Sequence, residues 1–168
     1  VSFGGADPSN LTLKTLEALK ELKNDFWVNV TLGLTNPHKK EIKEYVLKSK
    51  RNISVFENTS RMAALMQDAN LAISSGGTIS WELCCLGVPT IQIILAQNQI
   101  EAVEELHRRG ITGNLGWHEK VSTQQIHQAV EGLMADVQTR KEMSARGKSL
   151  VDGLGTQRGM NEILPYLN

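Results

Sequence analysis

Apolar residues recur along the chain with two spacings that alternate from one segment to the next. Runs in which every second residue, or nearly every residue, is apolar predict strands, and apolar residues three or four positions apart predict helices. The predicted strands are one that ends at Phe3 and the segments 26–32, 53–56, 70–74, 88–95 and 113–116. The predicted helices are 11–23, 37–49, a segment around 62–66, 78–86, 100–110, a segment after Ser122, 140–151 and 157–167.

Predicted strands and helices follow one another in this pattern. A helix between two strands makes the strands parallel, and such crossovers are right-handed. We therefore expect an α/β fold with a Rossmann-like, doubly wound parallel sheet and helices on both faces. A length of 168 residues suits one core, so we expect 1–168 to form a single domain. In such sheets ligands bind beyond the carboxyl ends of the strands, where the strand order reverses.

Charge and composition exclude several classes of function. The chain has 18 basic and 18 acidic residues, and no run of Lys and Arg exceeds two residues. It therefore lacks the basic surface that binds nucleic acid or anionic membranes. No apolar stretch approaches the roughly 18 to 20 residues that cross a membrane. The two cysteines, Cys84 and Cys85, are adjacent and cannot join distant segments, which is typical of a reducing compartment and predicts a cytoplasmic protein.

Two glycine pairs follow predicted strands, Gly4-Gly5 and Gly76-Gly77. Without Cβ atoms, backbone N–H groups at such a turn can approach an anion, and the dipole of a following helix adds to the attraction. A single pair is explained as well by a tight turn. Because both pairs are expected at the same edge of the sheet, we interpret them as a phosphate-binding site.

Glu82 lies five residues after Gly77, about one turn into the predicted helix. A carboxylate repels phosphate, but its two oxygens can accept hydrogen bonds from the two hydroxyls of a ribose. Phosphate and ribose together indicate a ribonucleotide. The alternative is an acidic residue that only complements the helix dipole.

Other nucleotide-binding motifs are absent from these loops. The segment 76–80 has no lysine at the position that a P-loop requires, and neither glycine pair forms G-x-G-x-x-G. Gln97, Asn98 and Gln99 follow the apolar strand 88–95, where uncharged amides can bind sugar hydroxyls. Capping of the next helix by Asn98 is the alternative.

Three segments together carry a resemblance: ISSGGTISWEL at 73–83, LGVP at 86–89, and Asn98-Gln99. They resemble the donor-binding, C-terminal half of GT-B nucleotide-sugar enzymes such as MurG. The opening segment VSFGGADPSNLT resembles more closely the PseG-like UDP-sugar hydrolases of pseudaminic acid and surface-polysaccharide biosynthesis. The resemblance extends from Val1 to about Ile111, and the remaining segment is not specific to any family.

The resemblance implies a set of binding residues. Gly76, Gly77 and Thr78 would hold the diphosphate, Glu82 the ribose, and the turn at Phe56 and Asn58 the uracil. The expected nucleotide-binding residues are Gly4, Gly5, Phe56, Asn58, Ser75, Gly76, Gly77, Thr78 and Glu82. The expected sugar-binding residues are Asn98 and Gln99. No metal, cofactor or catalytic residue is expected here, since the four histidines are not predicted beside the glycine loops and the hydrolase family carries its catalytic histidine in an N-terminal domain.

The expected function is therefore to bind the UDP moiety of a UDP-amino-deoxy-sugar as the nucleotide-binding half of a hydrolase. The alternatives are the donor-binding domain of a GT-B glycosyltransferase of the MurG or spore-coat polysaccharide type, a non-catalytic UDP-sugar-binding module, and a structural domain without ligand. Because the chain begins within a predicted strand, we expect an N-terminal domain of the same polypeptide to complete the site, and the isolated domain to be inactive.

Overall fold

The computed structural model describes residues 1–166. In this part of the chain all paired strands are parallel, in the order β2-β1 and β3-β4-β5. The two groups are joined by Ser2, which forms parallel bridges to Thr31 of β1 and Ser74 of β3. The strands are β1 (Trp27–Leu32), β2 (Asn52–Glu57), β3 (Ala72–Ser75), β4 (Thr90–Ile94) and β5 (Thr112–Trp117).

Residues 1–3 therefore take the place of the first strand of the sheet. The backbone N–H of Ser2 donates to Ile73 O at 3.0 Å, and the N–H of Thr31 donates to Val1 O at 3.0 Å. With this segment counted first, the strands follow the Rossmann order 3-2-1-4-5-6. The doubly wound parallel sheet is confirmed, and the strand order reverses between residues 1–3 and β3.

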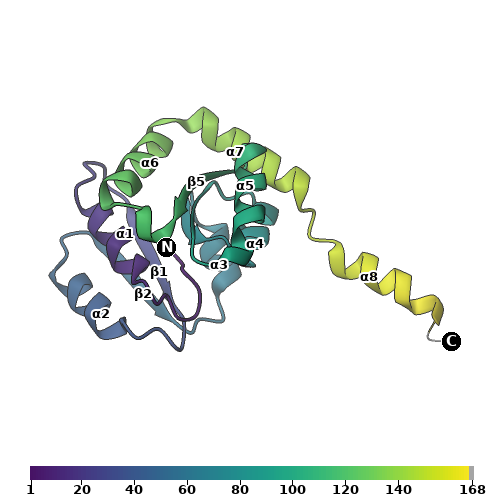
Figure 1. The fold of residues 1–168 in the computed structure, drawn as a ribbon, viewed down its shortest axis with the longest axis horizontal. Helices are drawn as coiled ribbons and strands as arrows, with labels where there is room; N and C mark the ends of the chain where they lie inside the picture. Colours follow the sequence, from purple (N-terminus) through teal and green to yellow (C-terminus); the bar gives the residue numbers. More distant parts are fainter. Residues whose placement is uncertain (167–168) are drawn as a thin grey trace.

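Helices cover both faces of the sheet (Figure 1). One face packs against α1 (Leu11–Lys20), α2 (Lys39–Lys48) and α6 (Thr123–Ala135) in the largest apolar cluster, which includes Ile73, Ile91 and Ile93. The opposite face packs against α3 (Met62–Gln67), α4 (Ile79–Leu86) and α5 (Ile100–Arg108).

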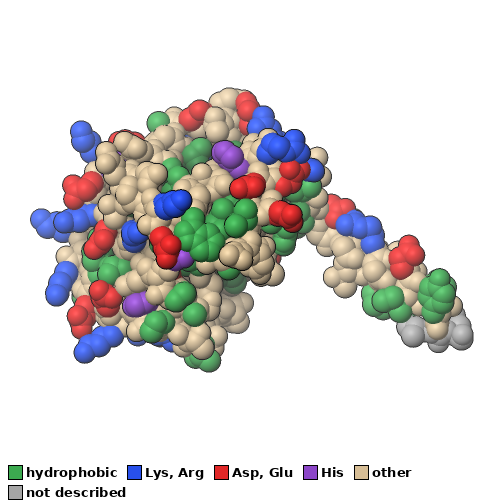
Figure 2. All heavy atoms as spheres, viewed as in Figure 1, with side chains coloured by type: hydrophobic (Ala, Val, Ile, Leu, Met, Phe, Trp, Pro, Cys, Tyr) green, Lys and Arg blue, Asp and Glu red, His purple; other side chains and the backbone are tan. Residues whose placement is uncertain are grey.

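The last two helices lie outside these layers. Helix α7 (Val137–Leu150) packs against α4, whereas α8 (Gly155–Ile163) extends away from the body of the domain (Figure 1). Several apolar side chains on and beside α8 are exposed: Leu154, Met160, Ile163 and Leu164. Figure 2 shows acidic and basic side chains interspersed over the visible face, in keeping with the equal numbers of the two charges.

The element boundaries differ from the predicted ones mainly at helix ends. The predicted helix 37–49 begins at Lys39, because the side chain of Asn36 accepts a hydrogen bond from the N–H of His38 and forms a turn first. The predicted helix 157–167 begins at Gly155, and its expected end at Leu167 lies outside the described residues.

The helices and the cysteines can be compared with what the composition predicts. The helices described in residues 1–166 all fall short of the length and apolar character that crossing a membrane requires. Cys84 has a free thiol and is buried, as expected of a small core residue. Its burial raises the pKa of the thiol to about 11.

Candidate functional site

A small pocket of about 220 Å³ lies where the strand order reverses, at the carboxyl ends of residues 1–3 and β3. The residues that line it come from the first loop, β3, α3 and the start of α4. They are Ser2, Gly4, Met62, Ser75, Gly77, Thr78, Ile79 and Glu82. The fold thus brings together five of the predicted site residues, namely Gly4, Ser75, Gly77, Thr78 and Glu82.

The N-terminus of α4 faces this pocket without a side-chain cap. Thr78 occupies the N-cap position, and within residues 1–166 no side chain accepts a hydrogen bond from the N–H groups of the first turn. The turn itself is closed by the N–H of Ser80, which donates to Gly77 O at 3.0 Å, and by the N–H of Trp81, which donates to Thr78 O at 3.1 Å. Because the N–H groups that open a helix have no partner within the helix, this end can accept an anion.

The two glycines of this loop are required for different reasons. A Cβ on Gly76 would lie 2.1 Å from Cγ2 of Val103 in α5, so the close approach of that helix demands glycine. A Cβ on Gly77 would meet no protein atom nearer than Ser75 Oγ at 3.9 Å. Gly77, which lines the pocket, therefore has open space beside it, whereas Gly76 packs directly against α5.

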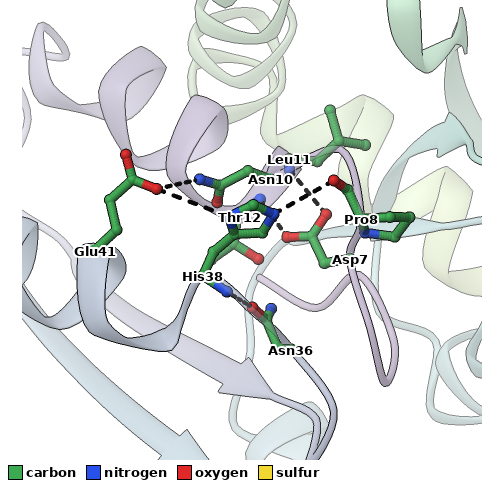
Figure 3. A network of polar contacts seen from close by, with 8 residues as sticks. All are labelled: Asp7, Pro8, Asn10, Leu11, Thr12, Asn36, His38 and Glu41. Atoms are coloured by element: carbon green, nitrogen blue, oxygen red, sulfur yellow. Dashed lines mark hydrogen bonds and ion pairs between the residues drawn. The ribbon is translucent and has the colours of Figure 1, made fainter.

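The first glycine loop is built differently. Gly4 has a φ of 79°, which favours glycine, and the loop continues to Asp7, whose side chain is buried. The carboxylate of Asp7 accepts hydrogen bonds from the N–H groups of Leu11 at 2.8 Å and Thr12 at 2.9 Å (Figure 3). The N-terminus of α1 is therefore occupied by a carboxylate of its own chain.

A further set of contacts fixes this loop against α2. The side chain of Asn10 donates to Glu41 at 2.8 Å, and a ring nitrogen of His38 lies 3.3 Å from the carbonyl oxygen of Pro8 (Figure 3). The second half of the loop 4–10 is therefore held against α1 and α2, and the residues before it are held in the sheet through Ser2.

Glu82 is exposed at the edge of the pocket, in the first turn of α4. Within residues 1–166 its carboxylate forms neither a hydrogen bond nor an ion pair, so its oxygens are available to a ligand. Glu82 thus lies about one helical turn beyond Gly77, as its spacing in the sequence predicts.

The remaining predicted residues do not line this pocket. Phe56 and Asn58 lie at the carboxyl end of β2, at the edge of the sheet, and Asn58 has a φ of 42°. Gln99 is engaged locally, since its Oε1 accepts a hydrogen bond from the N–H of Leu95 at 2.9 Å.

Gly5, Gly76 and Asn98 also lie outside the pocket lining. Gly5 packs closely on Gly33, since a Cβ on Gly33 would lie 2.3 Å from the Cα of Gly5. Gly76 is buried against α5, and Asn98 is exposed in the 3₁₀ turn Gln97–Gln99. The structure therefore joins three of the expected phosphate residues, Gly4, Gly77 and Thr78, with Glu82 in one cavity, but not the expected uracil and sugar residues.

Sequence reasoning missed three residues of the pocket: Ser2, Met62 and Ile79. Met62 begins α3 after the short loop 58–61 that follows β2, and it lines the pocket. Its position after a strand would have been the one available signal.

The four histidines are held elsewhere by hydrogen bonds. His107 contacts Thr112 O, His127 contacts Ala18 O and His118 contacts Ser9 Oγ, each within 3.1 Å, and His38 contacts Pro8 as described. None of them lines the pocket. In the described residues no group of three His, Cys, Asp or Glu side chains could hold a metal ion.

Comparison with solved structures defines the class: an α/β domain with the fold of the C-terminal half of GT-B glycosyltransferases. The chain belongs to the family described as the glycosyltransferase family 28 C-terminal domain, whose sequence model matches residues 3–155.

Individual relatives agree with this assignment. The chain is 29% identical over 160 residues to the spore coat polysaccharide biosynthesis protein SpsG of Bacillus subtilis, covering 94% of this chain and 47% of SpsG. It is 37% identical over 103 residues to the uncharacterized protein MJ1062 of Methanocaldococcus jannaschii, covering 60% of this chain and 21% of that protein. The crystal structure of MurG from Acinetobacter baumannii matches with a TM-score of 0.77 at 20% identity, over 96% of this chain and 47% of MurG. The chain thus spans about half the length of SpsG, and less of MJ1062.

Proposed function

We propose that this chain binds the UDP moiety of a nucleotide sugar and forms the donor-binding half of a GT-B glycosyltransferase that makes a surface polysaccharide. The observation that carries this proposal is the pocket at the strand-order reversal, where the uncapped N-terminus of α4 and the unpaired carboxylate of Glu82 lie one turn apart. Membership of family 28 and the similarity to a spore coat polysaccharide protein support it.

The two ends of this pocket suit two parts of one ligand. Backbone N–H groups at Gly77 and Thr78, with the helix dipole, attract the diphosphate. They would also stabilise the charge that develops on the diphosphate as it leaves the sugar. Glu82 repels phosphate and accepts hydrogen bonds from the ribose hydroxyls, which fixes the direction in which the nucleotide lies. The choice of uracil as the base rests on the resemblance of the loops.

The comparisons favour transfer over hydrolysis. The sequence alone favours hydrolysis of a UDP-amino-deoxy-sugar in pseudaminic acid biosynthesis, but the family and the similarity to SpsG support the alternative, a glycosyltransferase. The two reactions share the donor site and differ in whether water or a sugar or lipid acceptor attacks. We propose that the base that activates the attacking group lies in a further domain; among the described residues the histidines lie away from the pocket.

Calorimetric titration tests the proposal directly. UDP should bind, and ADP should bind much more weakly. Replacement of Glu82 by alanine should weaken UDP by about 1 to 3 kcal/mol, the cost of losing hydrogen bonds to a charged group. The matched control is Glu101→Ala, which removes another exposed glutamate from the first turn of a helix, α5, and should leave the affinity for UDP unchanged.

The ribose assignment has a second readout. The wild-type chain should bind 2′-deoxy-UDP more weakly than UDP, whereas the Glu82→Ala variant should bind the two alike. Equal binding of ADP and UDP would overturn the uridine assignment, and an unchanged affinity of Glu82→Ala would overturn the ribose contact. Turnover of a UDP-sugar by this chain alone would contradict the expectation that the base lies in another domain.

A further inference from the structure

A row of polar residues crosses the sheet on the face that packs against α4. Ser2 bridges to Ser74, Ser74 is in register with Gln92, and Gln92 is in register with Asn114. Residues in register on parallel neighbouring strands project on the same face. The opposite face carries the isoleucines of the main core, so this polar row is specific to the side that faces α4.

Gln92 is the most buried member of the row. It lies in the middle of β4 with no exposed surface, and its Nε2 donates to Oγ of Ser80 at 2.6 Å. Its Oε1 has no hydrogen-bond partner within residues 1–166. A buried polar atom without a partner lowers stability, and an apolar side chain of the same size would avoid that cost. The presence of glutamine here therefore calls for an explanation other than stability.

Ser80 provides that explanation through its place in α4. It is buried in the first turn, directly after Thr78 and Ile79, and its N–H closes the turn on Gly77 O at 3.0 Å. A hydrogen bond that fixes the Ser80 side chain to β4 therefore fixes the turn that presents the N–H groups of Gly77 and Thr78. On its other side the same loop is held by the close packing of Gly76 on Val103.

We propose that Gln92 is a positioning residue, which holds the first turn of α4 through Ser80 so that its backbone N–H groups point at the diphosphate of the bound nucleotide. This inference rests on the proposed function, because it concerns the same pocket. Gln92 touches no ligand itself. It is retained at a cost in stability because a rigid turn binds phosphate better than a mobile one.

The test compares UDP with uridine, which lacks the phosphates, in the wild-type chain and in Gln92→Leu. We expect the variant to lose about three- to tenfold in affinity for UDP, the scale of one or two weakened hydrogen bonds, and to bind uridine as the wild type does. Its midpoint of thermal unfolding should stay close to that of the wild type, because removing the unpaired Oε1 offsets the cost of leaving the buried Ser80 hydroxyl without its partner. Thr112→Val is the matched control, since it removes another buried and unpartnered polar group, on β5, and should leave both affinities unchanged.

A second variant, Ser80→Ala, removes the other partner of the hydrogen bond. It should lose the same selectivity for UDP over uridine, and the double variant should lose no more than either single one. An unchanged ratio of the UDP and uridine affinities in either folded variant would overturn the inference, as would a lower unfolding midpoint of Gln92→Leu with equal losses for both ligands. If the wild-type chain itself bound UDP no better than uridine, the proposed function would fall instead, and this inference with it.

Discussion

The two glycine loops of this domain look alike in sequence and differ in what lies at the helix that follows. Gly4-Gly5 and Gly76-Gly77 both leave the carboxyl edge of the sheet beside the point where the strand order reverses. At α1 the first N–H groups bond to the buried carboxylate of Asp7 (Figure 3), whereas at α4 no side chain among the described residues caps the helix.

This difference shows that a glycine pair before a helix does not by itself define an anion site. The helix end must also remain unoccupied, and a carboxylate already bonded to it repels a second anion. In this chain the first loop therefore serves as one wall of the pocket, and the second loop supplies the donors. Substitutions at three positions, Asp7, Gly76 and Gly77, can break or sharpen this contrast.

The largest effect is expected from removing the cap of α1. Asp7 has a φ of 42°, so Asp7→Gly removes the carboxylate without adding backbone strain. The free energy of unfolding should fall by about 2 to 4 kcal/mol, since two buried N–H groups lose a charged acceptor. Urea denaturation of the wild type and the variant measures this change in the free energy of unfolding. Asp7→Asn, which keeps one oxygen and tolerates this φ, should cost roughly half as much.

The same variants also test whether the two loops have separate roles. Asp7→Asn should bind UDP as tightly as the wild type, because Asp7 faces α1 and does not line the pocket. A large loss of UDP affinity in a variant that stays stable would assign Asp7 to the ligand, and the contrast between the two helix ends would no longer hold.

How far the sequence predicts this arrangement depends on the range of the interactions. The strands follow from local patterns, as in β4, where five consecutive residues are buried and the predicted segment 88–95 contains them. The pocket residues Gly77 and Glu82 follow from spacing within one helix turn. The role of Asp7 cannot be predicted in this way, because an Asp-Pro sequence indicates a turn but not the direction in which the carboxylate points. Likewise, the amide of Gln99 bonds to the backbone of Leu95, which no motif indicates.

The next largest effect on stability is expected at Gly76, where glycine is required by the packing of Val103, a residue distant in the sequence. Gly76→Ala places a methyl group against Val103, a buried and β-branched side chain that cannot rotate away easily. The free energy of unfolding should fall by about 1 to 3 kcal/mol from overpacking. The double variant with Val103→Ala provides the control, because the smaller side chain makes room. Its cost should be clearly less than the sum of the two single costs. Additive costs would show that packing against α5 is not the reason for glycine at this position.

The smallest effect on stability, and the most specific one on binding, is expected at Gly77. Because a Cβ there meets no protein atom within 3.4 Å, Gly77→Ala should change the free energy of unfolding by less than about 0.5 kcal/mol. The methyl group would nevertheless occupy the space next to the N–H groups of the loop, so the affinity for UDP should fall by about 1 kcal/mol or more while that for uridine stays the same. Gly132→Ala, on the exposed side of α6 where a Cβ also meets nothing, should change neither affinity. If Gly77→Ala bound UDP like the wild type, the open space beside Gly77 would not be where the phosphates lie, and the uncapped helix end would lose its role as the feature that separates the two loops.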